Sequence, residues 1–395
     1  AIKNVDVSGS VVYRYNDYAN DEVTAGKDSD NSNVNHYKIG LNLSSKVNDD
    51  VKLNTRVVAG SQADAGFVAL DSNGADGQAD ISLSHVNFGY TGIKNTTVTV
   101  GKQGLATPWT VALDSDGNEQ TGTGALAMTT LGQVTLGAGY FNQTNLNKST
   151  DAVLSNTDDG KGTKLYDSTT PASVLEGEDD ITTVGAIAAV GPVTLDAWYL
   201  DMNDVFDSYT VGAKAATELS GIKLGADARY AALTLEKKIA DAIANTKDDN
   251  NMAKLVLTAD AGLVDGKLAY AMTDKDGGLT ALDNDATTTL LGWSITANGK
   301  ADADYIQAVL GFDILANLNL SANYGNIEYK ATNLANSADV EEEEVYAQLL
   351  YKMSKNLSTY VRYGTYTKEE TTIASGTTTD KNDDVRGRLQ VEYTF

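Results

Sequence analysis

Apolar and polar side chains alternate with a period of two along most of this chain. In residues 5–15 the odd positions carry Val, Gly or Tyr and the even positions carry mainly Asp, Ser and Arg, with Val12 as the exception. Such alternation places the two sets on opposite faces of a β-strand, and helical periodicity is almost absent. The pattern recurs and predicts further strands in 37–44, 51–57, 193–199, 222–230, 318–324 and 385–395.

The connections between these runs differ in length. Some are very short, at 45–50, 191–192 and 354–356, whereas others are long and polar, at 16–35, 142–180 and 367–384. Short turns at one end and long loops at the other are typical of an outer-membrane β-barrel. Leu235, Ile239 and Ile243 are spaced by four and predict a short helix within a loop. No repeat or composition break appears, so we expect one domain over 1–395.

Alternation alone also fits a soluble β-sandwich, so the apolar face needs a further test. Arginine is costly on a lipid face, about 2–4 kcal/mol near the midplane, and is favourable in an aqueous lumen. All six arginines fall within predicted strands on the polar parity, and we predict that they line a pore: Arg14, Arg56, Arg229, Arg362, Arg386 and Arg388.

Aromatic residues support the same interpretation. Tyrosines cluster at the ends of the apolar faces, as in the interfacial girdles of barrels, although strand propensity alone also favours tyrosine. Phe395 ends the last alternating run on the apolar parity. At about 9–11 residues per spanning strand, the chain supports about 16–18 strands, a size at which barrels enclose an aqueous channel. We predict an all-β transmembrane antiparallel barrel of about 16–18 strands.

Composition excludes several other classes of protein. The formal net charge of −24 argues against nucleic-acid binding. The absence of cysteine removes disulfides, thiolate zinc sites and cysteine nucleophiles, and His36 and His85 are too few for a multi-histidine metal site. No HExxH or GxSxG motif occurs. No apolar run approaches the length of a spanning helix, and the sequence from Ala1 onward lacks the basic region and apolar region of a signal peptide.

An irregular acidic segment, 103–124, follows the strand predicted at 98–102. It contains Pro108, Trp109 and three acids, Asp114, Asp116 and Glu119. We predict that it folds into the barrel as a third loop, where its carboxylates would attract cations and repel anions. The same acids resemble a calcium loop in composition. A solvated acidic turn and a paired-carboxylate hydrolase are the alternatives, and nothing in the sequence fixes the separation of the carboxylates.

Three groups of residues resemble the major outer membrane porin family of Campylobacter and its relatives. They are residues 1–9 with Tyr13-Arg14-Tyr15, the series Gly101-Lys102-Gln103, Trp109-Thr110, an Asp-Gly pair and Gly122-Thr123-Gly124, and the C-terminal Val385-Arg386, Leu389-Gln390, Tyr393 and Phe395. The resemblance implies an 18-stranded, cation-selective homotrimer with calcium at its constriction. The Asp-Gly pair corresponds to Asp116-Gly117, with Asp114 as competitor, and a second metal ligand falls near Asp151.

The sequence therefore predicts a passive diffusion channel for ions and small hydrophilic solutes, without a catalytic site, in the outer membrane of a Gram-negative bacterium. Its expected partners are outer-membrane lipid, small solutes and two further copies of itself. The alternative from another class is a soluble or surface-attached calcium-binding β-sandwich adhesin. A barrel enzyme such as a lipase is a third possibility.

Overall fold

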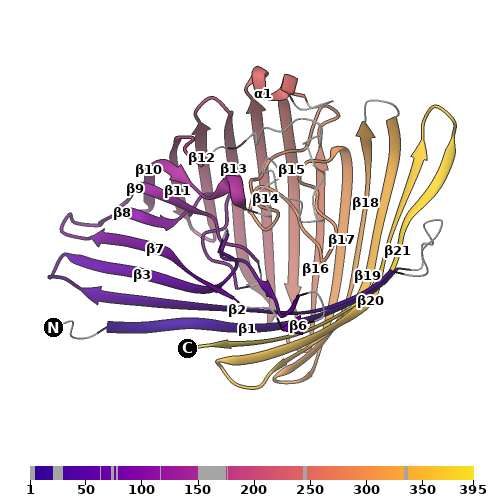
Figure 1. Cartoon of the computed structure of the whole chain (residues 1–395), viewed down its shortest axis with the longest axis horizontal. Helices are drawn as coiled ribbons and strands as arrows, with labels where there is room; N and C mark the ends of the chain where they lie inside the picture. The colour runs from indigo at the N-terminus through magenta and orange to yellow at the C-terminus, as the bar shows by residue number, and fades with distance from the viewer. Residues whose placement is uncertain are drawn as a thin grey trace.

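The computed structural model is a closed barrel of antiparallel strands (Figure 1). The structure describes residues 5–20, 30–62, 64–72, 75–76, 79–115, 117–149, 175, 177–242, 247–332 and 337–395. Each strand pairs with its sequence neighbours, and β21 pairs with β1 to close the ring. This ring confirms the predicted all-β barrel. A closed sheet suits a bilayer, because it leaves no strand edge without hydrogen-bond partners.

Eighteen strands form the ring: β1 (Val5–Asn20), β2 (Asp30–Lys46), β3 (Val51–Gly60), β7 (Asp80–Tyr90), β8 (Thr96–Gly104), β9 (Thr121–Leu131), β10 (Val134–Thr144), β11 (Ile181–Val190), β12 (Val193–Met202), β13 (Phe206–Leu219), β14 (Ile222–Leu235), β15 (Asp249–Asp260), β16 (Val264–Thr273), β17 (Ala301–Leu315), β18 (Leu318–Thr332), β19 (Ser337–Lys352), β20 (Leu357–Thr372) and β21 (Thr377–Thr394). Three short strands lie between β3 and β7. β4 (Val68–Ala69) pairs with β2, and β5 (Asp71–Ser72) pairs with β6 (Ala75–Asp76).

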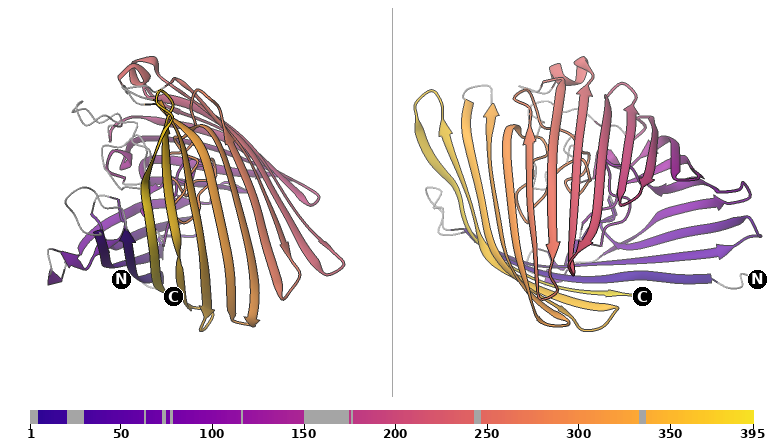
Figure 2. Two further views of the ribbon diagram at one scale, coloured as in Figure 1. Left: turned by 90° about the vertical axis from the view of Figure 1, so that its right-hand side faces the viewer. Right: turned by 180° about the vertical axis from the view of Figure 1, so that it is seen from behind.

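Tight turns and longer connections lie at opposite ends of the barrel (Figure 2). The β11–β12 turn uses two residues, 191–192, and its glycine has a φ of 59°, a left-handed conformation that suits glycine. The opposite end carries the 3-10 helix η1 (Leu146–Lys148) and the helix α1 (Lys237–Ala242). α1 lies within the 235–244 stretch where the sequence predicts a short helix. No helix among the described residues is long and apolar enough to cross a membrane.

The two faces of the sheet have the predicted chemistry. Large apolar side chains point outward and are exposed, including Val211, Leu310 and Phe395. On the opposite face, Arg14 and Arg229 are only 5% and 6% exposed. Apolar residues face outward in every alternating run of the sequence, so the apolar parity marks the lipid side and the polar parity marks the lumen.

Two predicted loops are wrong in extent. The polar segments 16–35 and 367–384 consist largely of strand, because β1 extends to Asn20 and β21 begins at Thr377. In these segments the hydrogen-bonded ladder continues beyond the apolar part of each strand, whereas the sequence pattern marks only the apolar part. The irregular part of the acidic segment is likewise shorter than 103–124. It spans 105–120, because Thr121 already begins β9.

Candidate functional site: two inward loops and the charged lumen wall

The β8–β9 loop, residues 105–120, packs inside the barrel. Leu105 and Trp109 are fully buried in an apolar cluster with Phe141, Phe206 and other inner-face residues of β10–β14. A tight turn shapes the tip, where the Thr110 hydroxyl donates to the Leu105 carbonyl at 2.6 Å. Burying a large aromatic side chain contributes a few kcal/mol. Apolar packing against the barrel wall therefore holds this part of the loop in the lumen.

A buried ion-pair cluster holds the other end of this loop against the wall. Arg56 of β3 donates twice to the Glu119 carboxylate, at 2.7 and 2.6 Å, and Lys38 of β2 lies 2.9 Å from the same group. The Lys38 ammonium also donates to the carbonyls of Asp114 and Gly117. Lys38 and Glu119 are fully buried. The two strands thus bind the loop through one carboxylate and two carbonyls.

The ionised state of Glu119 is maintained by its partners. Burial alone raises the pKa of a carboxyl group, because it disfavours the charged form. The hydrogen bonds and charges of Arg56 and Lys38 outweigh this effect and leave the pKa of Glu119 below its usual value. The negative charge of Glu119 is consequently balanced by Arg56 and Lys38 of the barrel wall.

A second loop, between β16 and β17, also fills the lumen. Residues 274–300 contain no long regular element, yet Leu279, Leu282 and Ile295 are fully buried. Asn298 organises the loop, because its side chain accepts from the amides of Thr280 and Ala281 and donates to the Ala281 carbonyl at 3.0 Å. The irregular trace lies inside the ring in Figures 1 and 2. Sequence reasoning missed this loop, although an irregular connection of this length is usually functional.

The two inward loops contact each other. The Leu282 amide donates to the Trp109 carbonyl, and the Leu282 carbonyl accepts from the Gln120 side chain, both at 2.9 Å. The Thr287 hydroxyl donates to the Pro108 carbonyl at 3.0 Å. The loops therefore form one assembly, which brings Asp283, a buried acid, next to the β8–β9 loop.

The six arginines predicted to line the pore fall into three groups on the inner face. Arg56 holds Glu119, and Arg229 of β14 pairs with Asp196 of β12 at 2.8 Å. The remaining four lie on the adjacent strands β20, β21 and β1: Arg362, Arg386, Arg388 and Arg14. Aromatic rings accompany this last group, which we call the arginine wall. Arg386, for example, lies 4.0 Å from the centre of the Tyr366 ring.

The family model of the Campylobacter major outer membrane protein matches residues 1–395. The chain belongs to this family. Among curated proteins, no sequence matches it significantly. The family match confirms the resemblance seen in the sequence, and both termini and the β8–β9 loop lie within it.

Several solved structures have a fold similar to that of this family member. OccK5 (OpdH) of Pseudomonas aeruginosa has a TM-score of 0.71 at 16% identity, with 100% of this chain and 98% of that chain covered. OccAB3 of Acinetobacter baumannii has a TM-score of 0.72 at 14% identity, with 99% of each chain covered. OpdK of P. aeruginosa, solved with vanillate, has a TM-score of 0.70 at 16% identity, with 99% and 98% covered. At these identities the likeness concerns the fold.

Family and fold together identify an outer-membrane, porin-like channel. They indicate a channel and not an enzyme, and they do not favour the β-sandwich adhesin. This result agrees with the lumen-facing charges and with the outward apolar surface.

The predicted acids of the constriction occupy different environments. Asp114 is half-buried, and its carbonyl accepts from Lys38. Glu119 is fully buried in the ion-pair cluster. Asp116 and Asp151, the two predicted calcium ligands, lie outside the described residues. The described residues contain no group of three or more His, Cys, Asp or Glu side chains arranged to hold a metal.

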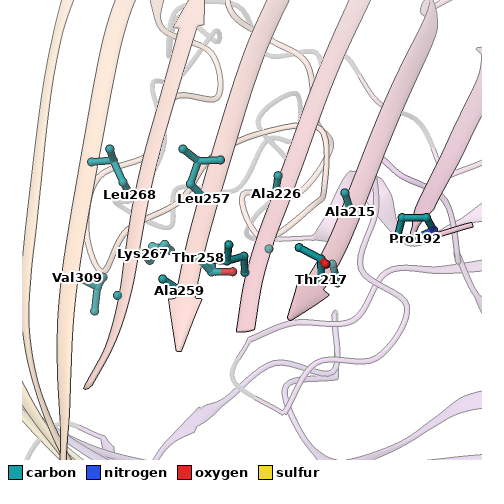
Figure 3. Close-up of a pocket in the computed structure, with 14 residues that line it drawn as sticks. Pro192, Ala215, Thr217, Ala226, Leu257, Thr258, Ala259, Lys267, Leu268 and Val309 are labelled. Carbon is teal, nitrogen blue, oxygen red and sulfur yellow. The ribbon is translucent and has the colours of Figure 1, made fainter. Parts of the chain in front are cut away.

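One recess lies on the barrel wall, away from the inward loops (Figure 3). Its volume is about 830 Å³ and it extends across β13–β17 near the tight turns. Its lining is mainly apolar and includes Ala215, Ala226, Leu257 and Leu268. Leu257 and Leu268 belong to the exposed outward face. In a membrane this recess faces acyl chains, so it has the wrong chemistry for a hydrophilic solute.

Proposed function

We propose that the protein is a passive diffusion channel for ions and small hydrophilic solutes. The observation that supports this most strongly is a closed 18-strand barrel whose ionised side chains face inward and whose two inward loops narrow the lumen. An aqueous path with fixed charges lets solutes cross down their gradients without a chemical step. Planar-bilayer recording of the detergent-extracted protein tests the proposal. Stepwise openings support it, and a silent bilayer contradicts it.

We further propose that the channel prefers cations. The net charge of −24 supports this, because a negative field attracts cations and repels anions. Asp114 is a half-buried acid of the β8–β9 loop, and the Glu119 charge in the same loop is balanced by Arg56 and Lys38. The reversal potential in a potassium chloride gradient measures the preference. Replacement of Asp114 or Asp116 by asparagine should move that potential towards the value for an unselective pore.

A calcium ion at the loop assembly is also part of our proposal. The Asn118 side chain donates to the Ser149 hydroxyl. Asn118 comes two positions after Asp116 and Ser149 two positions before Asp151, so this hydrogen bond joins the two segments that carry the predicted ligands. Its side-chain oxygen is buried without a partner among the described residues, and hard cations prefer such oxygen ligands. Asp116, Asp151, the Asn118 oxygen and Asp283 would hold the ion. When bound, it would neutralise these carboxylates and join the two inward loops.

The homotrimer implied by the family resemblance is likewise a proposal. The mass of the protein in detergent, after correction for bound detergent, measures the number of copies. A mass of three chains supports the proposal, and a mass of one chain contradicts it.

A further inference from the structure

Two arginines of the arginine wall stand directly opposite each other. Arg362 of β20 is the cross-strand partner of Arg388 of β21. Both lie on the inner face, because their neighbours Val361 and Leu389 are exposed on the outer face. Like charges at directly opposite positions of an antiparallel pair are destabilising. This pair therefore concentrates positive charge at one place on the lumen wall.

The hydrogen-bond partners of the pair are neutral among the described residues. Arg362 Nε donates to the Gln348 side chain at 2.5 Å. Arg388 donates to Asn16 at 2.8 Å and to the Tyr18 hydroxyl at 3.2 Å. By contrast, an aspartate or glutamate neutralises three other arginines: Arg56, Arg229 and Arg386. Arg362 and Arg388 thus keep their charges without a carboxylate partner in the described part of the chain.

Trp293 of the β16–β17 loop lies beside both guanidinium groups. The Cζ atoms of Arg362 and Arg388 are 5.8 and 5.7 Å from the centre of a Trp293 ring. The loop is fixed here, because the amides of Trp293 and Ser294 donate to Glu344 at 2.9 and 2.7 Å. The indole Nε1–H is buried, and no acceptor for it exists among the described residues. Buried donors normally have a partner, so among the residues described this indole is an unsatisfied donor beside the arginine pair.

A recess of about 210 Å³ is lined by Arg362, the cross-strand partner of Arg388, and by Gly292, which precedes Trp293; Arg388 and Trp293 themselves do not line it. Lys267, Asn323 and Tyr346 also line it, so most of its polar groups can donate hydrogen bonds. Glu344 is the acid in the lining, but its two oxygens accept from the backbone amides of the loop. The recess is large enough for a small organic anion.

We propose that Arg362, Arg388 and Trp293 form a binding subsite for small organic carboxylates. The planar guanidinium fork matches the two oxygens of a carboxylate, and a bound negative charge relieves the repulsion within the pair. The indole N–H supplies a further donor. This inference rests on the proposed channel function, since the anion must enter the lumen. It adds a local anion subsite to a pore whose long-range field favours cations.

Benzoate titration of single-channel current tests the subsite. With potassium benzoate added to wild-type channels in potassium chloride, the current should fall with a saturable dependence on benzoate concentration. Arg362→Gln and Arg388→Gln should each raise the half-blocking concentration about tenfold, the scale expected for a hydrogen bond to a charged group. Trp293→Phe keeps the aromatic ring but removes the donor, and should raise it about threefold.

Lys214→Gln is the matched control, because it removes an inward-facing cation on β13, away from the arginine wall. It should leave the half-blocking concentration unchanged within about twofold. Normal openings in potassium chloride without benzoate block in the wild type would overturn the subsite and leave the channel function intact. Equal effects of Lys214→Gln and Arg362→Gln would also overturn it, because block would then follow overall charge. A wild type without any openings refutes the channel itself.

Discussion

Replacement of Glu119 by glutamine should release the β8–β9 loop from the wall. The change leaves Lys38 and Arg56, which are 0% and 5% exposed, without their shared carboxylate. Removal of one partner from a buried ion pair costs about 3–5 kcal/mol. Glutamine retains one acceptor oxygen, so we expect about 3 kcal/mol, which corresponds to at least about a hundredfold increase in loop opening.

Hydrogen exchange measures this opening directly. The amides of Leu105 and Gln120 donate to carbonyls of the same loop, and the Glu119 amide donates to the Asp64 carbonyl, all at 2.8 Å. These three amides should exchange at least about a hundredfold faster in the variant. Amides in β13 and β14 should not change. Asp49→Asn is the control, since the Lys46–Asp49 pair lies in an exposed turn. Unchanged exchange at the three loop amides in Glu119→Gln would show that the ion-pair cluster does not hold the loop.

Other changes to the same loop give separate predictions. Trp109→Ala removes a fully buried ring and should lower the free energy of loop docking by about 3–5 kcal/mol, measured by the same exchange experiment. Gly40→Ala places a Cβ against the Arg56 guanidinium and should accelerate exchange in the direction of Glu119→Gln but by less. Because the pKa of Glu119 is lowered in the folded loop, its stabilisation is complete above the ordinary carboxyl range and is lost as the pH falls through the lowered pKa. Acid should therefore accelerate loop exchange in the wild type, and a variant with Gln at 119 should not show this step. Chelation of calcium should lower the thermal midpoint of the wild type, and Asp116→Asn should remove that sensitivity. A midpoint insensitive to chelator would contradict the calcium proposal.

The fold was largely predictable because lipid imposes a simple rule on each strand. Most outward side chains in the bilayer are apolar, so alternation indicated many of the strands and the polar parity on which all six arginines fall. The ends of the longest strands were not predictable. Above the bilayer both faces are wet, and the backbone ladder of β20 and β21 continues without any apolar pattern.

The candidate site was less predictable, because its contacts join distant segments. Pro108, Trp109 and the nearby acids indicated an unusual loop, but no spacing rule relates Glu119 to Lys38 and Arg56 on other strands. The β16–β17 loop gave a weaker signal. Apolar residues at inward positions, such as Leu200 and Leu233, show afterwards that something covers the wall there. An apolar residue on the polar parity of a strand is therefore the sequence sign of an inward loop.

The pairing of the first and last strands constrains the order in which the barrel assembles. The amides and carbonyls of Gly9 and Phe395 exchange hydrogen bonds at 2.9 and 3.0 Å, so the seam joins residues almost 400 positions apart. Contacts of such separation form slowly, because a long stretch of chain must be ordered first. Until β21 is in place, β1 and β20 each have one edge whose backbone groups are unpaired. Loss of the last strand would thus leave an open sheet with two unpaired edges, which could pair with other chains, in place of a ring.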